Sequence, residues 1–160
     1  MSTMTTKSRL FIDLDGTVAR FYDASPNYLE QMYEKGYFRN LQPYEEMTEG
    51  IKLFMEQHKD VEVFTLSAKV NGEPPYCEAE KQEWLDEYLP EIDREHRLFT
   101  EIGHNKAEYI PNGISNTDVL YDDYNKNLID WENSGGVALK CHNNSKKHHK
   151  NPQRDTNIQS

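Results

Sequence analysis

Short apolar runs alternate along this chain with segments of helical spacing, and this alternation limits the possible folds more than any other feature. The apolar runs cover residues 10–14, 61–66, 118–121 and 137–139. The first is broken by one acid and followed by Asp15 and Gly16, which is typical of a buried strand that ends at a carboxylate. Strands that alternate with helices predict an α/β fold, a Rossmann-like parallel sheet in a three-layer arrangement with helices.

The helical segments have readable ends. Pro43 suits a first helical position, and the apolar spacing after it predicts a mostly amphipathic helix over residues 43–58. A second helix is expected over 77–89, where Pro90 marks the stop. A third is expected over 125–133, and it ends before two glycines that suit a left-handed exit.

The segment 21–42 differs from its surroundings because it is rich in aromatic residues, with one helix expected around 28–35. It lies between the first strand and the next core helix. We therefore expect a small helical cap insertion over the strand ends, where ligands bind in open α/β sheets. The 160 residues suit one domain. We place that domain at 1–140 and expect a polar, flexible tail over 141–160, which has almost no apolar residues.

The charge of the chain restricts its partners. It has 28 acidic and 18 basic residues, a net charge of −10. The last 20 residues hold four basic residues and one acidic residue. The first 140 residues therefore hold 14 basic and 27 acidic residues, a net charge of −13. This balance argues against binding to a nucleic-acid polymer or a membrane surface. Any anionic ligand must be held by local positive groups or a bound cation.

The expected location is the cytoplasm. The first residues contain no apolar leader segment, and no apolar run approaches the roughly 18 residues of a membrane span. The two cysteines, Cys77 and Cys141, are too few for a disulfide framework and are interpreted as ordinary thiols of a reducing compartment.

The strongest chemical signal is the run DLDGT at residues 13–17. Two aspartates two positions apart on an extended chain point the same way, and Gly16 permits a sharp turn whose N–H groups can face an anion. A site that keeps both carboxylates ionised implies a bound metal, and oxygen ligands suit Mg²⁺.

A second acidic pair, Asp122-Asp123, ends the run at 118–121. If the two strands are neighbours, all four carboxylates converge at one edge of the sheet. For either pair alone, the alternative is that acidic residues are common in loops after strands. Two pairs that each follow an apolar strand favour a site.

Further residues can complete a phosphate site. Ser67 follows another predicted strand, where its hydroxyl and the N–H of Ala68 can hold a phosphoryl oxygen, although a strand-end serine can also cap a helix. Lys106 supplies a point charge that offsets a nucleophile and a phosphate, although alone it reads as a surface residue. Gly16 and Thr17 join this phosphate-binding set through the turn after the first strand.

In this order and at these strand ends, the residues resemble the four motifs of the haloacid dehalogenase (HAD) superfamily of aspartate-nucleophile phosphotransferases. DLDGT looks like the first motif, Ser67 the second, Lys106 the third and Asp122-Asp123 the fourth. The surrounding segments DLDGTVARF, VEVFTLSAK and VLYDDYNKNLIDW are similar to the 5′(3′)-deoxyribonucleotidase branch, the cytosolic type C nucleotidases. The insertion of this chain is shorter than theirs.

The resemblance implies a Mg²⁺-dependent phosphomonoesterase that hydrolyses nucleoside 5′- or 3′-monophosphates, deoxyribonucleotides above all, through an aspartyl-phosphate. Asp13 is then the nucleophile, and Asp15 is the general acid and base. The metal ligands are an Asp13 carboxylate oxygen, the Asp15 backbone carbonyl and Asp123, with Asp122 assisting directly or through the other ligands.

The resemblance also implies a base pocket around Phe21, where these nucleotidases place an aromatic ring against the base. The alternative is that Phe21 packs the insertion onto the core. Arg20, Tyr37 and Phe38 are further candidates for the pocket.

The expected partner is a small phosphorylated metabolite, and a nucleoside monophosphate is favoured among these. The sequence also allows a homodimer. Two other functions compete with a nucleotidase: a HAD phosphatase for another small phosphate such as a sugar phosphate, and a non-catalytic phosphate-binding module. The second aspartate argues against the last, because a protein that only bound phosphate would not need an acid and base.

Overall fold

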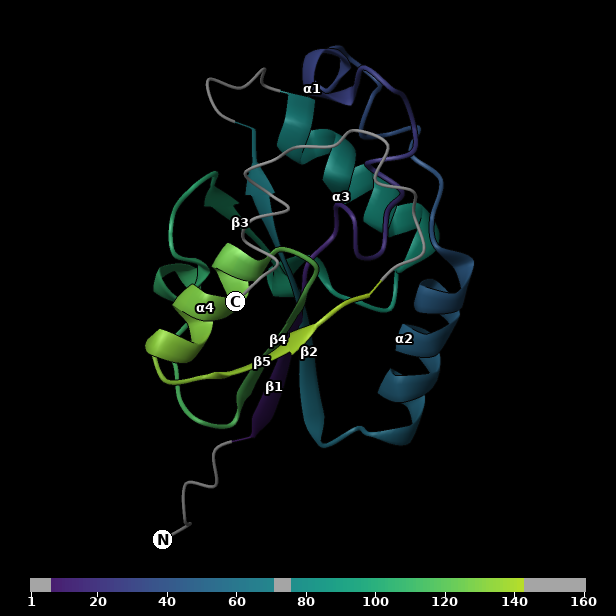
Figure 1. Cartoon of the computed structure of the whole chain (residues 1–160). Helices are drawn as coiled ribbons and strands as arrows, with labels where there is room; N and C mark the ends of the chain where they lie inside the picture. Colours follow the sequence, from purple (N-terminus) through teal and green to yellow (C-terminus); the bar gives the residue numbers. More distant parts are fainter. Residues whose placement is uncertain (1–6, 71–75, 143–160) are drawn as a thin grey trace, which may run out of the picture.

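A computed structural model of the chain describes residues 7–70 and 76–142. Over these residues, five strands form one sheet in the order β3-β2-β1-β4-β5, and every pairing is parallel (Figure 1). The strands are β1 (Ser8–Ile12), β2 (Val61–Lys69), β3 (Arg97–Glu101), β4 (Asp118–Asp122) and β5 (Val137–Lys140). The parallel sheet predicted from the sequence is confirmed.

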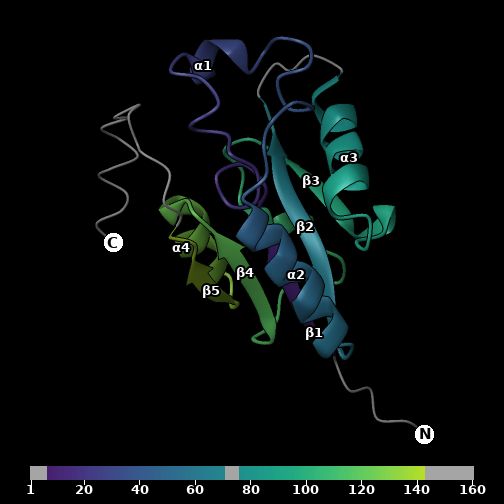
Figure 2. The same ribbon diagram turned by 90° about the vertical axis from the view of Figure 1, so that its right-hand side faces the viewer.

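Helices cover both faces of this sheet. They are α1 (Tyr28–Gln31), α2 (Glu45–Gln57), α3 (Tyr76–Tyr88) and α4 (Asn125–Asn133), with 3₁₀ turns η1 (Arg94–His96) and η2 (Lys106–Tyr109). Figures 1 and 2 show α2 and α3 on one side of the strands and α4 on the other. The three-layer α/β fold is therefore confirmed as well. In the described ranges, no helix has the length and apolar character that crossing a membrane requires.

The core consists of two clusters, one on each face of the sheet. Phe11 of the central strand packs with Trp131 of α4, with ring centroids 5.3 Å apart. The next residue, Ile12, belongs to the other cluster, with Ile51 of α2 and Trp84 of α3. Neighbouring strand residues point to opposite faces, so a central strand buried on both sides must be apolar at successive positions. That requirement explains the apolar run from which this strand was predicted.

Several boundaries differ from the prediction. The first strand ends at Ile12 and not at residue 14, because the chain turns after Leu14, whose carbonyl accepts the N–H groups of residues 17–19. The helix expected from Pro43 begins at Glu45, after Tyr44 as its N-terminal cap.

The insertion helix expected over 28–35 extends only over Tyr28–Gln31, since the next N–H groups bond three residues back, as Tyr33 does to Glu30. The strand β3 was not predicted from the sequence. The predicted flexible tail lies outside the described residues from position 143 onward.

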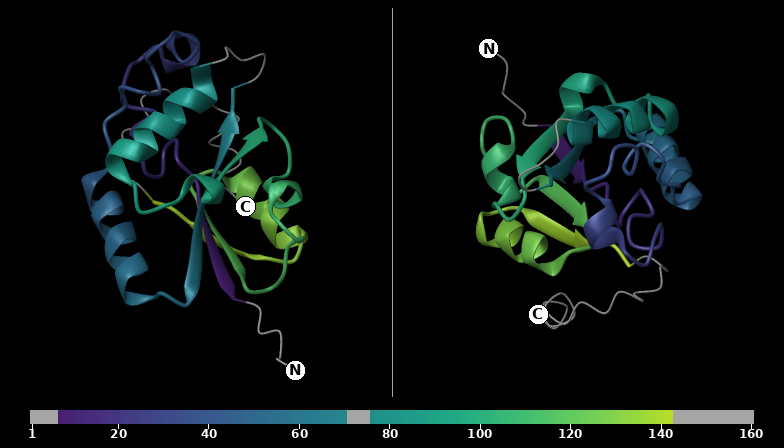
Figure 3. Two further views of the ribbon diagram at one scale, coloured as in Figure 1. Left: turned by 180° about the vertical axis from the view of Figure 1, so that it is seen from behind. Right: turned by 90° about the horizontal axis from the view of Figure 1, so that it is seen from above.

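The insertion lies over the carboxyl ends of the strands, as predicted. Figures 1 and 3 show α1 at the end of the molecule opposite the start of β1, next to α3. Two side chains of α3 hold the insertion: a carboxylate oxygen of Glu80 accepts the N–H of Gly36 at 2.6 Å, and the indole N–H of Trp84 donates to the Leu41 carbonyl at 2.8 Å. The insertion is therefore bonded to α3 through its backbone.

Candidate active site

The central strands bring the two acidic pairs to one edge of the sheet. β1 and β4 are neighbours in parallel register, with Ile12 beside Tyr121. The N–H of Asp13 continues this pairing by donating to the Tyr121 carbonyl at 3.0 Å. The two strands that end at the acidic pairs are therefore neighbours, which is the condition under which the sequence predicts that their carboxylates converge.

Three of the four carboxylates gather there. One oxygen each of Asp13, Asp122 and Asp123 lies within 4.8 Å of the others, and all three residues are buried. The Thr17 hydroxyl lies 3.2 Å from Asp13 Oδ2 and 3.4 Å from Asp123 Oδ1. Gly16 has φ +84°, and a Cβ there would stand 2.5 Å from Asp123 Oδ2, so this turn requires glycine.

Lys106, from η2, supplies a buried ammonium to this acidic cluster. Its Nζ donates to Asp13 Oδ1 at 2.9 Å, to Asp122 Oδ2 at 2.8 Å and to the Leu66 carbonyl at 2.9 Å. Burial alone would lower the pKa of Lys106, but the charges of Asp122 and Asp13 and the bonds to them outweigh it and raise that pKa above its ordinary value. Lys106 is therefore a fixed cation between the two carboxylates.

The acidic cluster also has the chemistry of a cation site. Burial, followed by the charge of Asp13, raises the pKa of Asp122, and Lys106 and the N–H of Tyr124 only partly oppose this rise. The ammonium of Lys140 lies nearby, 2.9 Å from the Asp123 backbone carbonyl. Among these residues, three carboxylates face two ammonium groups, and every potential ligand is an oxygen. Such a set fits a hard divalent cation such as Mg²⁺.

Asp15 lies apart from the acidic cluster. Its Oδ2 accepts a hydrogen bond from Nζ of Lys81 in α3 at 2.9 Å. The same Nζ donates to Ser67 Oγ and to the Ala68 carbonyl, each at 2.7 Å. The two aspartates of the DLDGT run are thus held by two different buried lysines.

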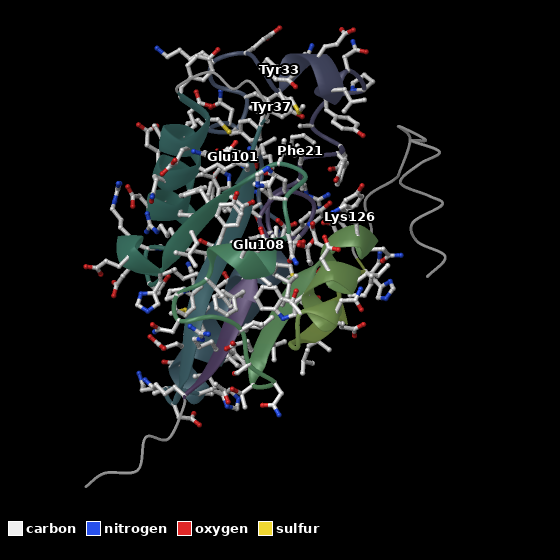
Figure 4. The ribbon with its side chains drawn as sticks, turned by 90° about the vertical axis from the view of Figure 1, so that its left-hand side faces the viewer. Phe21, Tyr33, Tyr37, Glu101, Glu108 and Lys126 are labelled. Carbon is white, nitrogen blue, oxygen red and sulfur yellow. The ribbon has the colours of Figure 1, made fainter. Side chains whose placement is uncertain are left out.

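A cavity of about 310 Å³, which we call the active-site cavity, joins these groups to the insertion. Asp13, Asp15, Lys106 and Asp123 line it on the strand side, and aromatic residues line it on the insertion side (Phe21, Tyr22, Tyr28 and Phe38). In Figure 4, Glu101 and Lys126, which also line the cavity, lie on either side of Phe21. A larger hollow of about 430 Å³ lies between α2 and the sheet, but its lining is almost all apolar and includes none of these carboxylates.

The predicted phosphate-binding residues divide into two groups. Ala68 and Lys106 line the active-site cavity. Gly16, Thr17 and Ser67 do not line it and are buried beside the residues that do. The Thr17 hydroxyl lies beside Asp13 and Asp123, Ser67 Oγ accepts from Lys81, and Gly16 leaves no room for a Cβ beside Asp123, so the three residues support the wall of the cavity.

The predicted base-pocket residues also differ among themselves. Phe21 and Phe38 line the cavity with their rings stacked, the centroids 5.9 Å apart. Arg20 does not line it: its side chain is 45% exposed, pairs with Asp23 at 2.9 Å and lies over the Tyr44 ring at 4.4 Å. Tyr37 does not line it either, and its hydroxyl donates to the Phe21 carbonyl. Phe21 lines the cavity and packs against other aromatic residues of the insertion, and its contact with a base stays a prediction.

Lys81 is the main residue that the sequence reading missed. It shares the buried side of α3 with Cys77, Trp84 and Leu85, at the helical spacings of four and three residues. Lysine is rarely buried without a charged partner. A lysine on the apolar side of a predicted helix is therefore a signal that could have identified it.

Comparison with known proteins adds a family to this geometry. A family model described as 5′ nucleotidase, deoxy (pyrimidine), cytosolic type C protein matches residues 25–160. A chain in the "Structure of Pnkp1/Rnl/Hen1 complex" is similar with a TM-score of 0.57 and 16% identity, over 88% of this chain and 48% of that one. This chain thus spans about half the length of that relative, and at this identity the likeness shows the fold alone. No curated protein matches the chain.

Proposed function

Because this chain belongs to the 5′ nucleotidase, deoxy (pyrimidine), cytosolic type C family, a HAD-like family of nucleotidases, we propose that it is a Mg²⁺-dependent phosphatase of nucleoside monophosphates, deoxyribonucleotides above all. The resemblance read from the motifs is confirmed at the level of the family. The metal, the substrate and the roles of individual residues belong to the proposal.

The observation that carries the proposal is the setting of Asp13. Its carboxylate lines the active-site cavity, and Lys106 and Thr17 hold its two oxygens. A carboxylate fixed in this way is oriented for attack on a phosphorus atom, and the ammonium of Lys106 offsets part of the repulsion between the nucleophile and an anionic phosphate. Asp15 lines the same cavity and is separate from the acidic cluster, which suits an acid and base.

The reaction then has two steps. An Asp13 oxygen bonds to phosphorus while the bond from phosphorus to the substrate oxygen breaks, and Asp15 gives its proton to that leaving oxygen. Water next bonds to phosphorus and loses a proton to Asp15, and the bond between Asp13 and phosphorus breaks to release phosphate. Asp13 is then a free carboxylate again, and Asp15 again carries the proton that it gave away in the first step.

The acidic cluster would hold the Mg²⁺, which when bound offsets the charge that an anionic phosphate brings to an anionic nucleophile. Asp13 and Asp123 line the cavity and Asp122 does not. Asp122 instead bonds to Lys106, to Asn127 and to the N–H of Tyr124. The lining of the cavity therefore favours Asp13 and Asp123 as ligands, with Asp122 orienting Lys106. The Asp15 backbone carbonyl stays a predicted ligand.

The insertion side of the cavity supports a substrate with a flat apolar part. Phe21 lies at the centre of an aromatic group, edge-on to Tyr22 and Tyr28 with centroids 5.1 Å apart in both pairs. Stacking of a base on an aromatic side chain is worth about 1–3 kcal/mol. A nucleobase would use this wall, whereas a sugar phosphate would leave it uncovered.

The test is phosphate release from a panel of deoxyribonucleoside, ribonucleoside and sugar monophosphates, with Mg²⁺ and with a chelator. We expect nucleotides to react fastest, the chelator to stop the reaction, and Asp13→Asn to abolish it. Asp86→Asn is the matched control, because Asp86 pairs with Arg97 away from the cavity. Faster turnover of sugar phosphates would assign a different substrate, and a wild type without turnover would favour a binding module.

A further inference from the structure

The apolar side of α3 carries a lysine that is only 2% exposed. Lys81 follows Glu80, which binds the insertion, and precedes Trp84, which does the same one turn later. Figure 2 shows α3 beside the upper part of β2, beneath the insertion. The helix therefore faces both the insertion and the strand ends at this point.

The ammonium of Lys81 is fully used by two segments of the active site. A lysine has three N–H donors, and those of Lys81 go to Asp15, Ser67 and the Ala68 carbonyl at 2.9, 2.7 and 2.7 Å. The Phe38 ring of the insertion covers Nζ, 4.8 Å from the ring centroid. One cation thus fixes the loop after β1 relative to the end of β2 and to a wall of the cavity.

Lys81 does not itself reach the cavity. It is not among the residues that line it, whereas its acceptors Asp15 and Ala68 are. A buried ion pair is also weak grounds for stability, because removing two charges from water costs about as much as their attraction returns. The contacts of Lys81 thus point to the placement of Asp15 and not to contact with a substrate.

We propose that Lys81 is a positioning residue that fixes the Asp15 carboxylate for proton transfer. The proposal rests on the proposed phosphatase function, in which Asp15 protonates the leaving oxygen and then takes a proton from water. Without the Lys81 ammonium, the Asp15 carboxylate can rotate away from the reacting oxygen, while Asp13 and Lys106 stay in place to bind the phosphate. Loss of Lys81 should therefore slow the steps that move protons more than it weakens binding.

The test compares the wild type with Lys81→Met on two substrates, the best nucleoside monophosphate and p-nitrophenyl phosphate. Since general acid–base catalysis contributes about 10²–10⁴-fold, misplacing the acid should lower kcat on the nucleotide by about 10- to 100-fold and change KM by less than about threefold. In the first turnover, p-nitrophenolate leaves without a proton. Its release rate should therefore fall much less than that of the nucleoside.

Two controls separate positioning from folding. Arg9→Met removes another buried cation, which pairs with Asp118 at 2.8 Å at the far end of the sheet, and it should lose stability but keep kcat. Lys81→Gln keeps a hydrogen-bond donor, so it should retain more activity than Lys81→Met and gives a second test if the methionine variant does not fold. Circular dichroism checks that each variant is folded.

The outcomes distinguish this role from the proposed function. A wild type inactive on every monophosphate would overturn both. If the wild type is active and Lys81→Met lowers the first-turnover rate equally for both leaving groups, only the positioning role is overturned. A raised KM with unchanged kcat would likewise overturn it, because Lys81 would then act in binding. A first-turnover loss confined to the leaving group that needs a proton would support it.

Discussion

Replacing Lys106 with methionine should destabilise the protein strongly in the presence of a chelator and much less in the presence of Mg²⁺. Methionine keeps most of the aliphatic stem and removes the ammonium. The change leaves the carboxylates of Asp13 and Asp122 buried without the cation that now lies within 2.9 Å of each. A bound divalent cation would take over part of that neutralisation.

The magnitude follows from the burial of the partners. Removing one partner of a buried ion pair costs about 3–5 kcal/mol, and here one ammonium serves two carboxylates on side chains that are 10% and 0% exposed. For a chain of this size, each kcal/mol moves Tm by about 2–4 °C, so the melting temperature in chelator should fall by roughly 6–20 °C. At a Mg²⁺ concentration of about 100 times Kd, binding adds about 2.7 kcal/mol to the wild type. The variant should gain more, because its acidic cluster lacks a competing cation.

The assay is thermal or urea unfolding of both proteins, in chelator and across a Mg²⁺ titration. The double variant Lys106→Met with Asp122→Asn removes one carboxylate together with the ammonium, so it should recover part of the stability lost in chelator. Equal Mg²⁺ responses in the wild type and Lys106→Met would refute the idea that ammonium and metal neutralise the same carboxylates. Full stability of Lys106→Met in chelator would refute the assignment of a buried ion pair.

Three further predictions concern the same site. Folding raises the pKa of Lys106, so the stability advantage of the wild type over Lys106→Met should be full below about pH 10.4 and shrink as pH rises above it, as unfolding at several pH values would show. Asp123→Asn should abolish the rise in Tm with Mg²⁺, and an unchanged rise would remove Asp123 as a ligand. Phe21→Leu should raise KM for a nucleoside monophosphate by about tenfold, the effect of losing about 1–3 kcal/mol of stacking, while KM for glycerol phosphate stays constant.

The sheet and its acidic edge could be predicted because their signals are local in the sequence. A central parallel strand is buried on both faces and must read as an apolar run, as β1 and β4 do. The side chains that act at its end come directly after the run. The neighbouring positions of β1 and β4 then bring residues 13 and 122 together without further information.

Other parts depended on contacts between distant segments. The strand β3 (RLFTE) lies at an edge of the sheet and pairs only with β2, so it needs no apolar run and gave no pattern. Arg20 was a further candidate for the base pocket around Phe21. The structure instead places its guanidinium between Asp23 and the Tyr44 ring, partners that the order of residues alone does not reveal.

The two aspartates of the DLDGT run are two residues apart, yet the fold gives them different surroundings. β1 is the central strand, so its end is flanked by elements from both faces of the sheet. Lys106 comes from η2, on the face covered by α4, and binds Asp13. Lys81 comes from α3, on the opposite face, and binds Asp15. The Asp13 side chain is 10% exposed and shares its lysine with Asp122, whereas that of Asp15 is 23% exposed. Since a nucleophile must stay ionised and oriented while an acid and base must exchange protons with water, this difference supports the division of roles. It arises from the position of β1 in the sheet as much as from the motif itself.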